Sequence, residues 1–268
     1  MSTASAPMEI GRVALTVNDI ARVGAFYESV LGLTRLSSDG TAVLYGSGDR
    51  ALVELRADPA APRPSEREAG LFHTAFLLPS RADLGAWLIH ATDSGAQFAG
   101  ASDHNVSEAI YLSDPEGNGI EVCRDRPRNE WQTDGAHVQM GIARLNLNDV
   151  ARSAIAPWSG APAGTVVGHV HLQTGAIPQA RAFYADKLGF AVSTQMPNAA
   201  FYGSGGYHHH LATNTWNSNG AGPRTYPATG LADLQILATP AALARIGVAP
   251  GTKLPDPWGT SITLDAQS

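Results

Sequence analysis

Three residues that commonly bind metal ions occupy corresponding places in an internal repeat of this sequence: His73, Glu121 and His169. Two imidazoles and one carboxylate form a set that binds one face of a divalent metal ion and leaves its other coordination positions open to substrate. The three residues are far apart in the chain. Their shared position within the repeat is therefore the reason to expect that they meet.

The repeat is clearest between two segments that are 157 residues apart. Residues 12–17 and 169–174 each begin an alternating run that is typical of a β-strand, and each run is followed by a helical pattern, over 20–31 and 177–188. Both helical patterns contain Ala-Phe-Tyr, and a Tyr-Gly-Ser-Gly run recurs at the same offset. Asn18 or Asp19 can cap the first helix, and Pro178 suits the first turn of the other.

Two further units repeat the pattern less closely. One runs from His73 through a helix near 82–92 to an Asp-Pro-Glu-Gly-Asn turn at 114–118, which enters the strand of Glu121. The other begins at Asp233 and ends after a second Asp-Pro-x-Gly turn at 256–259. The sequence thus predicts an α+β chain of four units, each a strand, a helix and about three strands, with the last unit shortened. The four predicted units span residues 1–66, 67–135, 166–226 and 227–268, and a connector spans 136–165. Within the connector, residues 138–147 are the part that could form an ordered segment.

Composition excludes several classes of function. A chain of 268 residues can bury a large core. Charged residues make up 16% of it, the net charge is −6 and there is no basic run, which argues against a nucleic-acid surface. No apolar stretch reaches membrane-spanning length. The single cysteine, Cys123, excludes an internal disulfide and fits a cytoplasmic protein. Exposed sheet edges would be compatible with a homodimer.

Several motifs resemble the vicinal oxygen chelate superfamily. They are the Val-Gly-His-Val-His-Leu strand at 167–172, the Phe-Tyr helices and the turn at 114–122. That superfamily includes glyoxalase I, antibiotic-resistance binding proteins and extradiol ring-cleaving dioxygenases. Within it, four segments resemble the bacterial catechol-2,3-dioxygenases of the CatE type: 70–84, 100–122, 124–131 and 205–216. The resemblance covers nearly the whole chain and implies paired βαβββ units whose curved, barrel-like sheets enclose a metal ion.

The resemblance also implies where ligands stand, because in this superfamily they come from the first and last strands of a unit. The corresponding places here are Arg12 and Glu54, His73 and Glu121, His169 and one of His208–His210, and Asp233 and Thr263. Pairing the units in chain order would set an arginine at a ligand place and supply only one histidine. Pairing the two middle units supplies the whole set. We therefore predict that the second and third units enclose the metal and that the outer units form a metal-free partner.

The run His208-His209-His210 needs a strand register. Aligning the turn at 205–206 with that at 117–118 sets His209 against Glu121, and aligning the Tyr-Gly-Ser-Gly runs sets Leu211 against Glu54. Both alignments direct odd-numbered residues toward the metal, since neighbours on a strand point to opposite faces. His209 is therefore predicted as an active-site residue, while His208 and His210 face away. A bulge in the strand would shift this prediction.

His104 lies 17 residues before Glu121, near the expected rim of the cavity. It is either a substrate-contacting or acid–base residue, or it is simply exposed on the surface. His171 shares the inward face of His169 and could hydrogen-bond substrate or a metal ligand, but it is a weaker active-site candidate than His209. Cys123 is expected to be a small core residue, and His90 and His137 are expected to be structural or exposed.

The resemblance implies an extradiol dioxygenase that opens a catechol-type ring with O2 at non-haem Fe(II), with Mn(II) left open. His209 and His104 are the candidates for proton transfer, with no division of labour between them. Two alternatives remain. A glyoxalase-like lyase or isomerase uses the same fold with Zn(II) or Ni(II), often with two metal-bound glutamates. A metal-free small-molecule binding protein would not need His73, Glu121 and His169 together.

Overall fold

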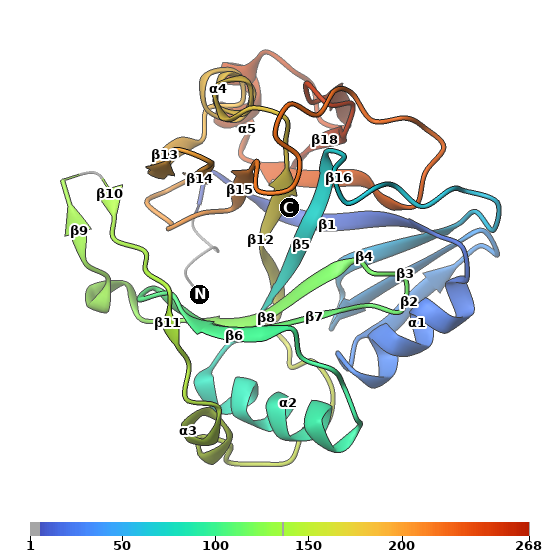
Figure 1. Ribbon diagram of the computed structural model, residues 1–268, viewed down its shortest axis with the longest axis vertical. Helices are drawn as coiled ribbons and strands as arrows, with labels where there is room; N and C mark the ends of the chain where they lie inside the picture. Colours follow the sequence, from blue (N-terminus) through green and yellow to red (C-terminus); the bar gives the residue numbers. More distant parts are fainter. Residues whose placement is uncertain (1–5, 136, 268) are drawn as a thin grey trace.

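The predicted strand–helix–strand–strand–strand repeat is present in the computed structural model, which describes residues 6–135 and 137–267 (Figure 1). The first unit comprises β1 (Met8–Val17), α1 (Ile20–Ser29), β2 (Thr34–Ser38), β3 (Ala42–Ser47) and β4 (Arg50–Ala57). The second comprises β5 (Gly70–Leu77), α2 (Arg81–Asp93), β6 (Gly100–Asp103), β7 (Ser107–Ser113) and β8 (Gly119–Asp125). Asp19 is the helix cap of the first unit, since its side chain accepts a hydrogen bond from Arg22 N at 2.9 Å.

The remaining units follow an ordered connector. It holds a 3-10 turn (Arg128–Glu130), β9 (Thr133–Asp134), β10 (His137–Val138), β11 (Ala143–Arg144) and α3 (Leu147–Arg152). The third unit comprises β12 (Val166–Gln173), α4 (Ile177–Arg181) with a π-helical continuation (Ala182–Lys187), β13 (Ala191–Met196), β14 (Ala199–Gly203) and β15 (Leu211–Asn214). The shortened fourth comprises β16 (Gly230–Ala238), α5 (Pro240–Ile246), β17 (Thr252–Pro255) and β18 (Ser261–Ala266).

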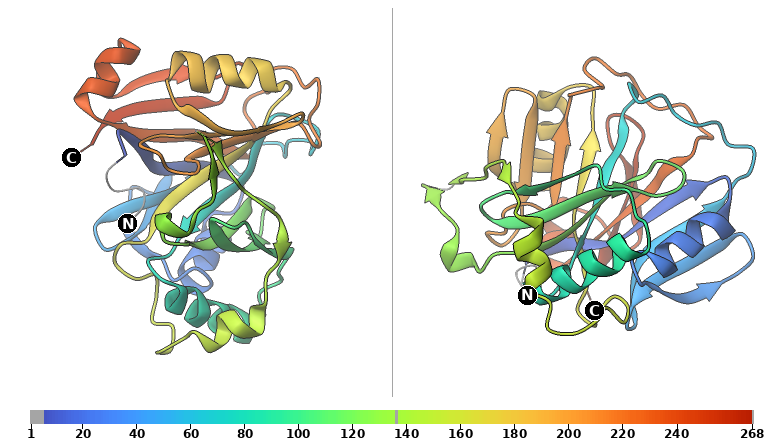
Figure 2. Two further views of the ribbon diagram at one scale, coloured as in Figure 1. Left: turned by 90° about the vertical axis from the view of Figure 1, so that its left-hand side faces the viewer. Right: turned by 60° about the horizontal axis from the view of Figure 1, so that its bottom comes forward.

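The strands pair as the ligand pattern requires. The second and third units share a nine-stranded sheet in the order β11-β6-β7-β8-β5-β12-β15-β14-β13, and the first and fourth share a seven-stranded sheet in the order β17-β18-β16-β1-β4-β3-β2. The antiparallel pair β5 and β12 joins the two middle units and crosses the centre of the molecule (Figure 1). The helices cover the outside of the sheets, with α4 and α5 at one end and α2 and α3 at the other (Figures 1 and 2). The predicted pairing of the units is therefore confirmed.

Strand alternation separates the core from the site. On β8, Ile120 and Val122 belong to the large core cluster between the two sheets, so Glu121 must point to the opposite, concave face. On β5, Phe76 belongs to that core, while Ala75 and Leu77 join a second buried cluster with Cys123. The concave face of the nine-stranded sheet thus carries His73 and Glu121 beside a small apolar floor. Cys123 is a core residue of that floor, as predicted.

A bulge at Gly168 sets the direction of His169. The register of β12 against β5 shifts between Val167 and His169, which adds one residue to β12. Val167 faces the large core, whereas His169, two residues later, lies with His73 on the concave face. A Cβ atom at position 168 would lie 2.9 Å from the Cβ atom of Leu77, so this position of the bulge requires glycine.

The outer sheet has an ion pair at the corresponding place. Arg12 Nε lies 2.9 Å from Glu54 Oε2, and its Nη1 donates to Gln235 Oε1 at 3.0 Å. Asp233 accepts hydrogen bonds from Ser261 (2.6 Å) and from Thr263 (2.8 Å). A guanidinium in this position links β1, β4 and β16 electrostatically. The outer pair of units thus keeps the ligand places of the repeat and fills them with an internal polar network.

Candidate metal centre

The three predicted ligands converge. His73 Nε2 lies 3.2 Å from Glu121 Oε2, His169 Nε2 lies 3.4 Å from the same oxygen, and the two ring nitrogens are 3.4 Å apart. Their donor atoms all lie within 4.8 Å of one another, and all three residues are buried. They come from neighbouring central strands: His73 from β5, Glu121 from the parallel neighbour β8, and His169 from the antiparallel neighbour β12.

The donor set fits a divalent cation. Two donors at right angles, each about 2.1 Å from one ion, are about 3 Å apart, close to the spacing seen here. Glu121 Oε1 is buried without a hydrogen-bond partner among the described residues, and an unpaired buried carboxylate oxygen is costly. Burial lowers the pKa of His73, which favours the neutral, metal-binding imidazole. Burial opposes ionisation of Glu121, but the electrostatic interactions and hydrogen bonds with His169 and His73 outweigh it and hold the pKa of that carboxyl well below its usual range.

The third unit places alanine where a fourth ligand would stand. In the second unit, Glu121 lies opposite Ala75, two residues after His73. In the third unit, the residue two after His169 is His171, and it lies opposite Ala212. The alignments that set His209 or Leu211 against the ligand place were therefore wrong, because β15 begins at Leu211 and that side chain faces the large core. A methyl group at position 212 supplies no donor atom for a metal ion.

His209 nevertheless lines the cavity, from the segment just before β15. Its ring centroid is 4.1 Å from that of His169. Its Nδ1 lies 2.8 Å from His208 Nδ1, and His208 Nε2 lies 3.0 Å from the Asp125 carboxylate. A carboxylate only accepts, so neutral His208 carries its hydrogen on Nε2, and His209 must donate through Nδ1. His209 Nε2 is then the nitrogen without a hydrogen. The sequence interpretation did not connect Asp125 with the three histidines.

His210 points away from the metal residues, as predicted. Its Nδ1 accepts a hydrogen bond from Ser204 N at 3.2 Å, and its Nε2 is buried without a partner among the described residues. Burial lowers the pKa of His210 to about 3, and the charge of His208 adds to the effect. A neutral imidazole is therefore built into the fold at this position.

This histidine predicts a loss of stability in acid. Because its pKa is lower in the folded than in the unfolded chain, its contribution is complete above about pH 6.5 and is lost as the pH falls toward 3. Between pH 7.5 and 5.0 we expect His210 alone to lower the free energy of unfolding of the metal-free protein by about 2 kcal/mol. Urea titrations at the two pH values should show this slope in the wild type. His210→Asn, which keeps an acceptor for Ser204 N, should reduce the slope by that amount, and an unchanged slope would contradict the assignment.

His104 lies at the rim of the same cavity rather than exposed on the surface. Its Nδ1 donates to Gly141 O at 2.8 Å, so its Nε2 in the neutral ring accepts from the Tyr111 hydroxyl at 2.6 Å. Burial raises the pKa of Tyr111, and the charge of Glu121 raises it further, so the phenol stays protonated. Tyr111 was missed in the sequence. Counting back from the turn at 114–118 would have found it, because the β7–β8 hairpin pairs Tyr111 with Glu121.

The other histidines separate by position. His171 lines the cavity and its Nε2 lies 3.0 Å from Asn214 Nδ2, while burial holds its pKa well below the usual range. An amide nitrogen only donates, so His171 carries its hydrogen on Nδ1. His90 Nε2 lies 2.7 Å from Ser29 O between α2 and α1, and His137 is exposed. Neither lines the cavity, in agreement with the prediction.

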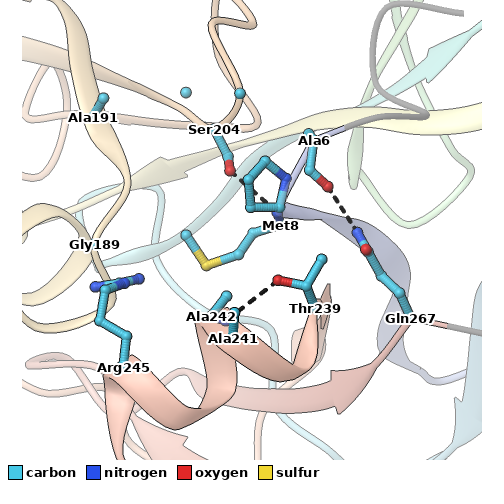
Figure 3. A pocket seen from close by; sticks show the side chains of 13 residues that line it. Ala6, Met8, Gly189, Ala191, Ser204, Thr239, Ala241, Ala242, Arg245 and Gln267 are labelled. Carbon is cyan, nitrogen blue, oxygen red and sulfur yellow. Dashed lines mark hydrogen bonds between the residues drawn. The ribbon is translucent and has the colours of Figure 1, made fainter.

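A second hollow lies elsewhere, where β1, the third unit and α5 meet (Figure 3). It measures about 560 Å³ and is lined mostly by small side chains around Met8, with Arg245 on one side. The Arg245 guanidinium donates to Leu188 O at 2.6 Å, and Ser204 accepts from Met8 N at 3.1 Å. Its lining includes no histidine and no carboxylate side chain. This hollow therefore offers neither an imidazole nor a carboxylate for metal binding or acid–base chemistry.

The chain belongs to the glyoxalase/bleomycin resistance protein/dioxygenase superfamily, whose family model matches residues 9–122 and 166–264. It is 39% identical over 229 residues to the catechol-2,3-dioxygenase of Bacillus subtilis (strain 168), covering 83% of this chain and 80% of that protein. It is 28% identical over 133 residues to biphenyl-2,3-diol 1,2-dioxygenase 3 of Rhodococcus globerulus, covering 48% of this chain and 70% of that protein.

Solved structures share the fold at low identity. Glyoxalase I from Zea mays superposes with a TM-score of 0.54 at 16% identity, over 97% of this chain and 92% of that one. The cppA protein from Streptococcus pneumoniae TIGR4 superposes with a TM-score of 0.57 at 11% identity, over 97% of this chain and 99% of that one. At such identities the likeness concerns the fold alone. No helix in the described parts of the chain has both the length and the apolar character needed to cross a membrane.

Proposed function

We propose that this chain is an extradiol dioxygenase that opens catechol-type aromatic rings with O2 at Fe(II) held by His73, Glu121 and His169. The observation that carries the proposal is the convergence of these three donors in one cavity, with Ala212 at the place of a fourth ligand. The likeness to a catechol-2,3-dioxygenase over most of the chain supports the same reaction class. A glyoxalase-type site with a second glutamate does not fit Ala212.

The bound ion would supply Lewis acidity toward the catechol oxygens and a path for electrons between the ring and dioxygen. Mn(II) has similar ligand preferences, so the donor set alone does not select Fe(II). We propose Fe(II) because of the proposed reaction. The apolar floor beneath Glu121, formed by Ala75, Leu77 and Cys123, keeps water from the ligands.

Two groups beside the donor set would act on the substrate, one near His169 and one near His73. Burial lowers the pKa of His209 well below its usual range, so its Nε2 carries no proton before substrate binds. It would accept a proton from a catechol hydroxyl, and the positive charge formed on its ring would be stabilised through His208 by Asp125. His104 faces the cavity through the Tyr111 hydroxyl. That hydroxyl donates to His104, so its oxygen can accept a hydrogen bond from the substrate. These contacts support the proposal that His209 acts as the base and that His104 with Tyr111 orients the substrate.

The direct test is oxygen uptake. Protein reconstituted anaerobically with Fe(II) and then mixed with catechol in air should consume about one O2 per catechol and form a yellow ring-opened semialdehyde. Protein loaded with Zn(II) should consume none, because Zn(II) has no redox chemistry. Isomerisation of the methylglyoxal–glutathione adduct without oxygen uptake on any catechol would instead establish a lyase.

We also propose that the protein is cytoplasmic, which is consistent with the free thiol of Cys123. We propose further that it forms a homodimer through exposed sheet edges.

A further inference from the structure

The cavity is much larger than the donor set needs. Its volume is about 770 Å³, within the range of about 300–1,000 Å³ that holds drug-sized ligands. Beyond the metal residues, its lining includes large apolar side chains from β5, the connector, β13, β14 and the segment after β15: Phe72, Met140, Ile142, Met196, Phe201 and Trp216. A catechol ring alone would leave most of these side chains in contact with water.

Exposed apolar side chains gather at the mouth of this cavity. Among the described residues, six large hydrophobic side chains are exposed, and three of these line the cavity: Ile142 (82% exposed), Met196 (39%) and Trp216 (47%). A concentration of exposed apolar surface around a pocket marks a place where an apolar group binds. The ligand therefore extends from the metal residues out to this rim.

Trp216 is held as one wall of the mouth. Its backbone N–H donates to Asn214 Oδ1 at 3.1 Å, and its ring packs edge-on against Phe72, with ring centroids 5.2 Å apart. Its ring is also 5.3 Å from that of His171, which is in turn 5.0 Å from the ring of His73. A continuous aromatic surface thus leads from the metal residues to the rim, which suits an arene.

A second wall comes from the connector, which contributes Met140, Gly141 and Ile142 to the lining. Gly141 N donates to His104 O at 3.2 Å, His104 Nδ1 donates back to Gly141 O, and Ala143 pairs with Asp103 on the neighbouring strand. These bonds fix Met140 and Ile142, on either side of Gly141, over the cavity. The same histidine that faces the substrate through Tyr111 therefore holds the apolar wall.

The lining contains no lysine or arginine. The nearby cations are committed elsewhere, since Arg124 Nε donates to Glu108 at 2.6 Å and Arg126 Nη2 to Asp103 at 2.6 Å. Glu121 adds a negative charge to the site, and the whole chain carries −6. The lining therefore offers no cationic side chain to offset the cost of taking a ring carboxylate out of water.

We propose that the substrate is an uncharged catechol bearing an apolar substituent of about the size of a second ring, seated between Trp216 and the Met140–Ile142 segment, and that carboxylated catechols are excluded. This inference rests on the proposed ring-cleaving function. It adds the substrate class and the residues that select it.

The first test compares substrates on Fe(II)-loaded wild-type protein. At least one of 3-phenylcatechol and 4-phenylcatechol should exceed catechol in kcat/KM by about 10- to 100-fold, since a second buried ring contributes to binding. 3,4-Dihydroxybenzoate should fall below catechol. Anaerobic calorimetric titration should give the same order of Kd values without turnover. Cleavage of catechol with no gain for either phenyl compound, or with 3,4-dihydroxybenzoate preferred, would overturn this inference and leave the proposed function standing.

The second test removes the wall. Ile142→Ser should lower the ratio of kcat/KM for the better phenylcatechol to that for catechol by at least about fivefold. Ile155→Ser is the matched control, because Ile155 is also exposed (89%) but lies outside this cavity, and it should leave the ratio unchanged. Equal ratios in the two variants would overturn the assignment of this wall. Tight anaerobic binding of phenylcatechol with no ring cleavage at all would support the ligand class and overturn the dioxygenase proposal instead.

Discussion

The His73→Ala protein is expected to lose both its metal ion and its activity. Of the three donors of the set, the substitution leaves Glu121 and His169, and two protein ligands hold Fe(II) poorly. Metal content after Fe(II) loading and desalting should fall from about one ion per chain to below about a tenth. Turnover on catechol should fall at least about 10³-fold, since a bound metal contributes several kcal/mol to such reactions. His169→Ala should behave in the same way.

Two controls separate this loss from general damage. His90→Ala removes a histidine that binds Ser29 O far from the cavity and should keep full metal content and rate. Glu121→Gln preserves the shape of the side chain but removes its charge, so the fold should persist while metal affinity drops. Circular dichroism should show folded protein in every case. Full occupancy in both His73→Ala and His169→Ala would show that the metal, if any, binds elsewhere.

Most of the fold could be predicted from the internal repeat in the sequence. Arg12, His73, His169 and Asp233 occupy equivalent positions on the first strands of the four units. In each unit, the residue two positions later lies opposite the ligand place on the last strand. Alternation of apolar residues around Glu121 was enough to assign its face. The chemistry of the ligand set then selected the pairing of the middle units, which hydrophobic pattern alone does not determine.

The predicted ligand place in the third unit was wrong because the strand register was off by one residue. The run His208–His210 precedes β15, so counting alternation through it gave Leu211 where the structure has Ala212. The bulge at Gly168 is of the same kind, and a one-residue shift reverses the face of every following side chain. Contacts between distant segments, such as His208 with Asp125, arise only when the strands pair and leave no local pattern.

The walls of the cavity were also beyond the sequence. Met140 and Ile142 lie in a connector of mixed polar and small residues, where no period distinguishes a functional side chain from an exposed one. Their positions follow from hydrogen bonds between Gly141 and His104. The residues that select the substrate are therefore harder to predict from sequence than the metal ligands, because their positions depend more on tertiary structure.

The His209→Gln protein is expected to keep its metal and turn over catechol about 10²–10⁴-fold more slowly, the range for the loss of a general acid or base. The three ligands are untouched, so metal content should stay at about one ion per chain. Glutamine can still hydrogen-bond to His208, but it cannot accept a proton. Metal analysis and the initial rate of oxygen uptake, measured on the same preparation, check both parts of the prediction.

Neighbouring histidines provide the comparison. His208→Gln breaks the link between His209 and Asp125, so we expect a smaller loss, of about tenfold, which Asp125→Asn should reproduce. His210→Gln should alter stability and leave the rate near that of the wild type, because His210 bonds to Ser204 outside the cavity. If His209→Gln left the rate unchanged while His104→Gln abolished it, proton transfer would belong to His104 and Tyr111, and the metal ligands would stand as assigned.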